Sequence, residues 1–201
     1  MELTEIPESL GKLTHLRSLD LYGNKLKTLP EVLERLHLLQ KINLGKNNFE
    51  TLPLLVTHLA SLTELRLYEN QLSELPPSLG QLTQLTNLNL YRNQLTTLPD
   101  SLGQLTQLTN LNLSHNQLTT LPDSLGQLTQ LTELNLFINQ LITLPGSLGL
   151  LRQLRSFNVG YNRLSILPNW LEELTNLKIL NISFYQFIIE LPPVLLSLIH
   201  I

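Results

Sequence analysis

Few side chains in this chain of 201 residues have the type and spacing that catalysis or metal binding requires. There is no cysteine, so no thiol nucleophile or thiolate metal ligand exists. The histidines share neither a spacing nor a face, and no glycine-rich phosphate loop is present. Ser114 and His115 are adjacent in the chain, so their side chains diverge rather than forming a nucleophile and its base. We therefore expect no enzymatic activity, no metal and no cofactor.

One polar residue does recur with a strict spacing, since an asparagine stands every 23 residues. An asparagine amide both donates and accepts, so one side chain can satisfy two backbone groups in a buried turn. At a fixed interval, such amides would form a ladder through a stack of equivalent turns. We expect this structural ladder at Asn24, Asn47, Asn70, Asn93, Asn116, Asn139 and Asn162.

The elements that position these amides follow from the surrounding pattern, LxxLxLxxNxLxxLPxxLxxLxx. The LxxLxL segment alternates apolar and polar residues, which predicts a half-buried strand. Equivalent strands stacked in one direction form a parallel sheet. The proline fixes φ and suits the start of a helical turn, so we expect short α or 3₁₀ turns on the return path. The strands should begin at Leu16, Leu39, Leu62, Leu85, Leu108, Leu131, Leu154 and Leu177.

The repeats predict a single domain over residues 1–201, because each unit contacts only its neighbours. Residues 1–15 form a partial N-terminal repeat, 16–176 form seven repeats of 23 residues, and 177–201 form an irregular last repeat. Terminal repeats usually need polar caps, whereas this chain ends in the apolar segment VLLSLIHI. We therefore expect a fragment of a longer protein or an end covered by a partner, and self-association through the uncapped C-terminal end in isolation.

Charge and hydropathy narrow the classes of partner. The net charge is −3, so no basic excess recruits nucleic acid or an anionic membrane. No apolar run approaches the roughly 18 residues that a membrane span needs. The N-terminus carries several glutamates and no apolar signal region. A cytoplasmic protein whose partner is another protein is the expected class.

The outward residues of the strands form columns on the concave face of the predicted sheet. The central column leaves two interpretations open: amides that bond to one another, or a row of donors and acceptors for a partner. It comprises Asp20, Asn43, Arg66, Asn89, Asn112, Asn135, Asn158 and Asn181. The next two columns hold most of the outward aromatics, which either pack along the ridge or bind a partner. The predicted partner-binding residues are Tyr22, Arg66, Tyr68, Tyr91, Arg92, His115, Phe137, Ile138, Tyr161 and Phe184.

The repeat, for example LTNLNLYRNQLTTLPDSLGQLTQL at 85–108, resembles the intracellular leucine-rich repeat proteins with 23-residue units. That group includes Ras-signalling scaffolds, Scribble-type polarity proteins and many bacterial repeat proteins. The resemblance implies an α/β fold: a right-handed solenoid, or horseshoe, with a parallel concave sheet of about eight strands and short 3₁₀ or α turns on the convex side.

The same resemblance implies a non-enzymatic protein–protein interaction module for scaffolding or signalling, which binds its partner on the concave face. An alternative stays open at this point. The chain could be the recognition or regulatory segment of a larger signalling enzyme or bacterial effector whose catalytic part lies elsewhere. As an effector it would be secreted into a host cell rather than remain cytoplasmic.

Overall fold

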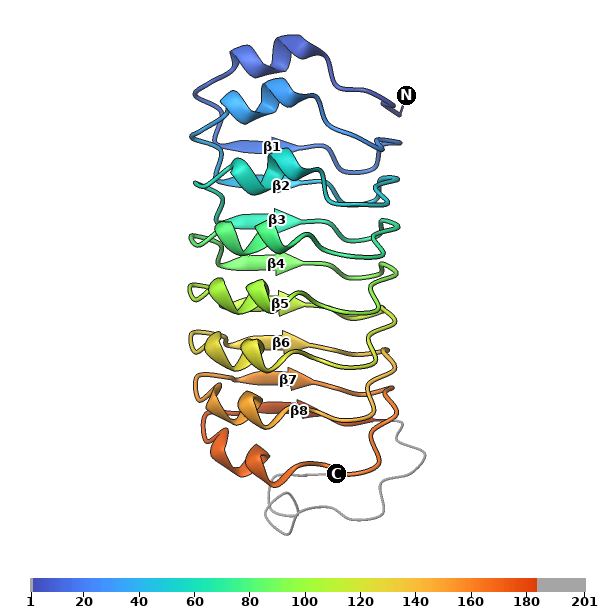
Figure 1. Ribbon diagram of the computed structural model, residues 1–201, viewed down its shortest axis with the longest axis vertical. Coiled ribbons are helices and arrows are strands. Elements are labelled where there is room, and N and C mark those ends of the chain that lie inside the picture. The colour runs from blue at the N-terminus through green and yellow to red at the C-terminus, as the bar shows by residue number, and fades with distance from the viewer. Residues whose placement is uncertain (1, 184–201) are drawn as a thin grey trace.

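The computed structural model describes residues 2–183, in which every repeat contributes one short strand and one short 3₁₀ helix. Figure 1 shows the strands in one layer and the helices in a second layer, both stacked along the long axis. The strands are β1 (Ser18–Asp20), β2 (Lys41–Asn43), β3 (Glu64–Arg66), β4 (Asn87–Asn89), β5 (Asn110–Asn112), β6 (Glu133–Asn135), β7 (Ser156–Asn158) and β8 (Ile179–Asn181). The helices are η1 (Glu8–Lys12), η2 (Glu31–Arg35), η3 (Leu54–His58), η4 (Pro77–Gln81), η5 (Asp100–Gln104), η6 (Asp123–Gln127), η7 (Gly146–Leu150) and η8 (Asn169–Glu173).

The strands form one parallel sheet in sequence order, which confirms the predicted fold class. Each residue pairs with its equivalent in the next repeat, as Leu88 does with Leu111. The strands begin later than predicted, because the first leucine of each segment still belongs to the preceding turn. The N–H of Leu16, for example, donates to the carbonyl of Leu13 at 2.9 Å.

The return path is 3₁₀ in every repeat that the structure describes. In the central repeat, Pro99 is extended and accepts from the N–H of Leu102 at 3.0 Å, a bond across three residues. Leu105 repeats the pattern by donating to Leu102. Two such turns direct leucines three residues apart into the core, because side chains three apart eclipse in a 3₁₀ helix.

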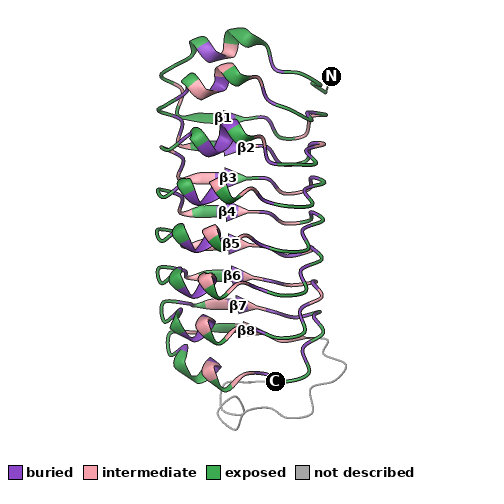
Figure 2. Ribbon diagram, viewed as in Figure 1, coloured by how far each residue is buried: buried purple, intermediate pink, exposed green. Residues whose placement is uncertain are grey.

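The core is a continuous column of leucines between the two layers, and Figure 2 shows buried segments in every repeat. Leu85, Leu88 and Leu90 are buried whereas Asn87 is exposed, as the alternation predicts. Phe49 and Phe157 replace leucines and are also fully buried. We call the face of the sheet turned away from the helices the strand face.

The asparagines at the 23-residue interval lie in the turns after the strands, and all but the half-buried Asn24 are buried. Asn116 is typical. Its Oδ1 accepts from the N–H of Leu95 at 3.1 Å, and its Nδ2 donates to the carbonyls of Leu90 and Leu113, each at 3.0 Å. One side chain thus joins its own turn to the preceding repeat.

The N-terminal half repeat takes the place of a preceding unit. The N–H of Leu3 donates to Asn24 Oδ1, and the carbonyl of Leu3 accepts from the N–H of Lys25, both at 2.8 Å. The irregular C-terminal segment and its predicted self-association lie outside the described residues. None of the helices in residues 2–183 has the length and apolar character needed to cross a bilayer.

Candidate functional site

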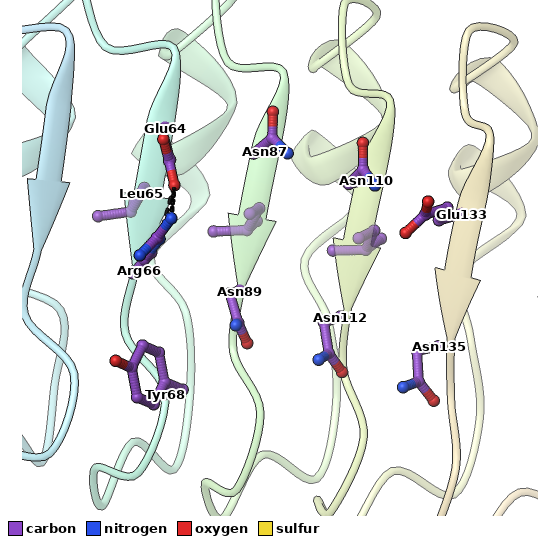
Figure 3. A pocket seen from close by; sticks show the side chains of 12 residues that line it. Glu64, Leu65, Arg66, Tyr68, Asn87, Asn89, Asn110, Asn112, Glu133 and Asn135 are labelled. Carbon is purple, nitrogen blue, oxygen red and sulfur yellow. Dashed lines mark hydrogen bonds and ion pairs between the residues drawn. The ribbon is translucent and has the colours of Figure 1, made fainter.

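The strand face carries a shallow hollow of about 490 Å³ over β3 to β6. Its floor consists of polar side chains in two rows, as Figure 3 shows, with the leucines of the strands between them. The lining residues are Glu64, Leu65, Arg66, Tyr68, Asn87, Leu88, Asn89, Asn110, Leu111, Asn112, Glu133 and Asn135. Arg66 and Tyr68 belong to the predicted partner-binding set; the other lining residues do not.

The central column does not form the chain of mutually bonded amides that one interpretation predicted. Only Asn43 donates to its column neighbour, Asp20, at 3.2 Å within the described residues. The other asparagines bond to their own backbone two residues further on. Asn89 Oδ1, for example, accepts from the N–H of Tyr91 at 3.0 Å. The physical reason is that each strand ends there, and its last N–H groups need an acceptor.

This backbone bond determines how each amide is oriented. A backbone N–H can only donate, so the atom that it meets is Oδ1 and the amide nitrogen must face away. Asn89, Asn112 and Asn135 share this arrangement on neighbouring strands and lie in parallel in Figure 3. No acceptor in residues 2–183 bonds to their Nδ2 atoms. We call these three residues the amide row; it presents donors to the hollow.

Charged residues lie at both ends of the hollow. On β3, Glu64 pairs with Arg66, whose Nε lies 2.6 Å from Glu64 Oε1, and with Lys41 at 3.4 Å. On β6, Glu133 occupies the equivalent position to Glu64 and is exposed. No cation of the described residues forms an ion pair with Glu133. The β6 end of the hollow therefore carries the unpaired negative charge of Glu133. At the β3 end, Arg66 and Lys41 compensate the negative charge of Glu64.

A row of aromatic rings follows the ends of strands β4 to β7 beside the hollow. The ring centroids of Tyr91 and His115 lie 5.0 Å apart, those of His115 and Phe137 5.8 Å, and those of Phe137 and Tyr161 5.1 Å. All three contacts are edge-to-face, the geometry that the aromatic quadrupole favours. We call Tyr91, His115, Phe137 and Tyr161 the aromatic row.

The aromatic row joins two sequence columns that the repeat pattern keeps separate. Tyr91 and Phe137 come from one column, His115 and Tyr161 from the next. The second column directly precedes the asparagine ladder, where the turn requires positive φ. His115 has φ 55° and Tyr161 φ 53°, which redirects their side chains toward the neighbouring column. The residue pattern does not reveal this zigzag, because only Gly23 and His115 in this column are residue types that favour a left-handed conformation.

The remaining predicted aromatics form a separate pair. The rings of Tyr22 and Tyr68 lie 5.8 Å apart although a whole repeat separates them, because Gly45 leaves room for Tyr68 between them. The ammonium group of Lys46 lies 5.9 Å from the centre of the Tyr22 ring. In the described chain no ring contact joins Tyr68 to Tyr91, so the predicted partner-binding aromatics form two clusters.

The other predicted residues do not share one environment. Arg92 is exposed and Ile138 is half-buried, both with positive φ at the edge of the strand face. Phe184 lies outside the described residues. His58 is far from this site, on η3, where its Nδ1 lies 2.9 Å from Glu34 Oε1. No group of three or more potential metal ligands occurs in residues 2–183.

Comparisons with known proteins agree with this architecture. The profile of the leucine-rich repeat region matches residues 5–190. The chain belongs to the leucine-rich repeat family. No curated protein matches it at a significant level.

Three solved structures illustrate the range of similar proteins. The LRR protein LIC12759 of Leptospira interrogans is 39% identical, with a TM-score of 0.91, over 95% of this chain and 48% of that one. The plant peptide hormone receptor RGFR1, in complex with RGF2, is 32% identical with a TM-score of 0.74, over 94% and 35%. TLR13, in a complex with ssRNA13, is 32% identical with a TM-score of 0.79, over 90% and 26%. The chain spans about half the length of the Leptospira protein and less of the other two.

Proposed function

We propose that this chain is a non-enzymatic recognition module that binds a protein partner on its strand face. The observation that carries the proposal is the aromatic row beside the hollow. Tyr161 is 40% exposed, and Tyr91, His115 and Phe137 are half-buried at the same edge. Partly exposed aromatics dominate the energy of protein interfaces, and a surface row of them marks an interaction site.

The electrostatics favour protein over nucleic acid. Binding of a phosphate backbone needs clustered lysines and arginines. Residues 81–150 carry only four charges, namely Arg92, Asp100, Asp123 and Glu133, and the net charge of the chain is −3. The complex of TLR13 with ssRNA13 is therefore a weaker guide to this chain than the peptide hormone receptor is. A partner with neutral polar and apolar groups suits the strand face better.

Affinity capture followed by calorimetry tests the proposal. Tyr91→Ala and Phe137→Ala should each weaken binding of the captured partner by about 2 kcal/mol or more, the loss typical of an interface hot spot. Gln81→Ala and Gln104→Ala, on the opposite layer in η4 and η5, are the matched controls and should bind as wild type does. The far-UV circular dichroism of all four variants should be unchanged. Binding that survives both aromatic changes but is lost in the glutamine variants would overturn the proposal.

A further inference from the structure

The amide row determines which hydrogen-bonding groups an occupant of the hollow must have. Asn89, Asn112 and Asn135 line the hollow with their oxygens bonded to the chain, and their Nδ2 groups have no acceptor in residues 2–183. An occupant that meets this row must therefore supply acceptors. In a polypeptide, the regularly spaced acceptors are the backbone carbonyls.

The spacing of the donors selects the conformation of that polypeptide. Asn89, Asn112 and Asn135 are direct neighbours in the sheet register, so consecutive donors lie about 4.8 Å apart and the outer two about 9.6 Å apart. In a polyproline II helix the carbonyls of residues three apart point the same way and are separated by about 9.3 Å. In an extended strand, carbonyls on one side recur at about 6.6–6.8 Å, which fits neither interval. An α-helix uses its carbonyls internally.

The walls of the hollow fit the same occupant. Tyr68 lines one side, and the aromatic row starts one repeat further on, at Tyr91. Proline-rich segments dock against aromatic side chains, and their backbone carbonyls remain unbonded. The distance from β3 to β6 is about 14 Å, which corresponds to about five residues in this conformation.

Glu133 adds a charge preference. It lines the hollow on β6, two residues before Asn135, and no described cation pairs with it. Its equivalent on β3, Glu64, is already neutralised by Arg66 and Lys41. A lysine or arginine of the occupant would form an ion pair with Glu133.

Building on the proposed strand-face function, we propose that the hollow binds a polyproline II segment of a partner protein that carries a basic residue. The amide row would donate to carbonyls three residues apart. Glu133 would pair with the basic side chain, and the aromatic side chains would hold the proline rings.

The probe is an acetylated, amidated proline-rich peptide of about nine residues, roughly 28 Å long, with one central lysine. A second peptide has glutamine in place of lysine. A third, of equal length, keeps the lysine among valines and threonines, which favour extended strands. Calorimetry and the side-chain amide resonances of the asparagines report binding. We expect the first two to bind, the third to bind at least tenfold more weakly, and the resonances of the amide row to shift.

Matched variants separate the two contacts. Asn89→Asp combined with Asn135→Asp keeps the oxygen that caps each strand but removes the donors, and Asp20 makes this bond natively with the N–H of Tyr22. This double variant should bind the uncharged glutamine peptide about tenfold more weakly. Glu133→Gln should reduce binding of the lysine peptide to that of the glutamine peptide and leave the glutamine peptide unaffected. Thermal melts of the variants should match wild type.

Several results would overturn this inference. They are absence of binding by the proline-rich peptides, equal binding of the valine–threonine peptide, insensitivity to both aspartates, or preference for a single-stranded RNA oligonucleotide. If a captured protein still depends on Tyr91 and Phe137 while the aspartate variants bind it normally, the polyproline assignment fails and the strand-face function stands.

Discussion

The amide nitrogen of Asn116 lies 3.0 Å from the carbonyl oxygen of Leu90, although 26 residues separate them in the chain. The same bond recurs from Asn47 to Asn162, each time to the strand end of the preceding repeat. The asparagine is therefore a buried polar link between neighbouring repeats, in addition to the apolar contacts and the backbone hydrogen bonds that the repeats share.

Replacing Asn116 with alanine should lower the free energy of unfolding by roughly 1–3 kcal/mol, because the buried N–H of Leu95 loses its acceptor. The carbonyls of Leu90 and Leu113 each lose one of their two amide donors. Asn112→Asp, on the half-buried strand face of the same repeat, keeps its bond to the N–H of Ser114 and should change stability by less than about 0.5 kcal/mol. Urea unfolding measures both. Equal losses would show that the buried asparagine has no special role.

The close stacking of the 3₁₀ helices predicts opposite effects at two glycines. A methyl group on Gly126 would lie 2.5 Å from the backbone oxygen of Ser147, so Gly126→Ala should destabilise by about 1–3 kcal/mol. Nothing lies within 4 Å of a methyl group on Gly146, at the start of η7. Gly146→Ala should stabilise the folded protein by about 0.4–1 kcal/mol, because alanine lowers the conformational entropy of the unfolded chain. Thermal melts that show the same sign for both would contradict this packing.

Ile138 has φ 52°, a conformation that is strained for a β-branched residue, and Gly23 occupies the equivalent position of the first repeat. Asparagine tolerates this conformation, so Ile138→Asn should raise stability by about 0.5–1 kcal/mol despite the loss of a half-buried side chain. Ile142→Asn is the control, since Ile142 is exposed and its φ is not positive. A gain of similar size at both positions would exclude relief of strain as the cause.

Gly45→Ala should separate the rings of Tyr22 and Tyr68. An added methyl group would lie 2.6 Å from the Tyr68 ring, which can rotate into solvent. We therefore expect loss of the nuclear Overhauser contacts between the two rings, with a stability change below about 1 kcal/mol. Persistence of those contacts in the variant would show that the ring does not need the space that Gly45 leaves.

Much of the fold was predictable, because the residues that determine it recur at a fixed interval and need only be apolar. Burial of Leu85, Leu88 and Leu90 requires only apolar character at the right interval, which a sequence displays directly. The strand limits were harder, since the N–H of Leu16 bonds within a turn that its residue type does not reveal.

The candidate site was less predictable, because it depends on where side chains point and not only on where they stand in the sequence. His115 reaches Tyr91 and Phe137 only because its φ is positive, a conformation that few residues other than glycine adopt. The donor character of Asn112 depends on where the N–H of Ser114 lies, not on the amide itself. Both features belong to the backbone, and a residue pattern does not record them.

The uniform register means that the length of the sheet is a whole number of identical strand spacings. From β1 to β8 every strand is offset from the next by one 23-residue unit, without insertion. Residues 78–100 and 101–123 are almost identical, and removing the second copy would join Asp100 to Ser124 and restore the same PDSLG segment. Loss or gain of such a copy in the gene therefore changes the length of the strand face in steps of about 4.8 Å. The repeat pattern stays intact at the new junction.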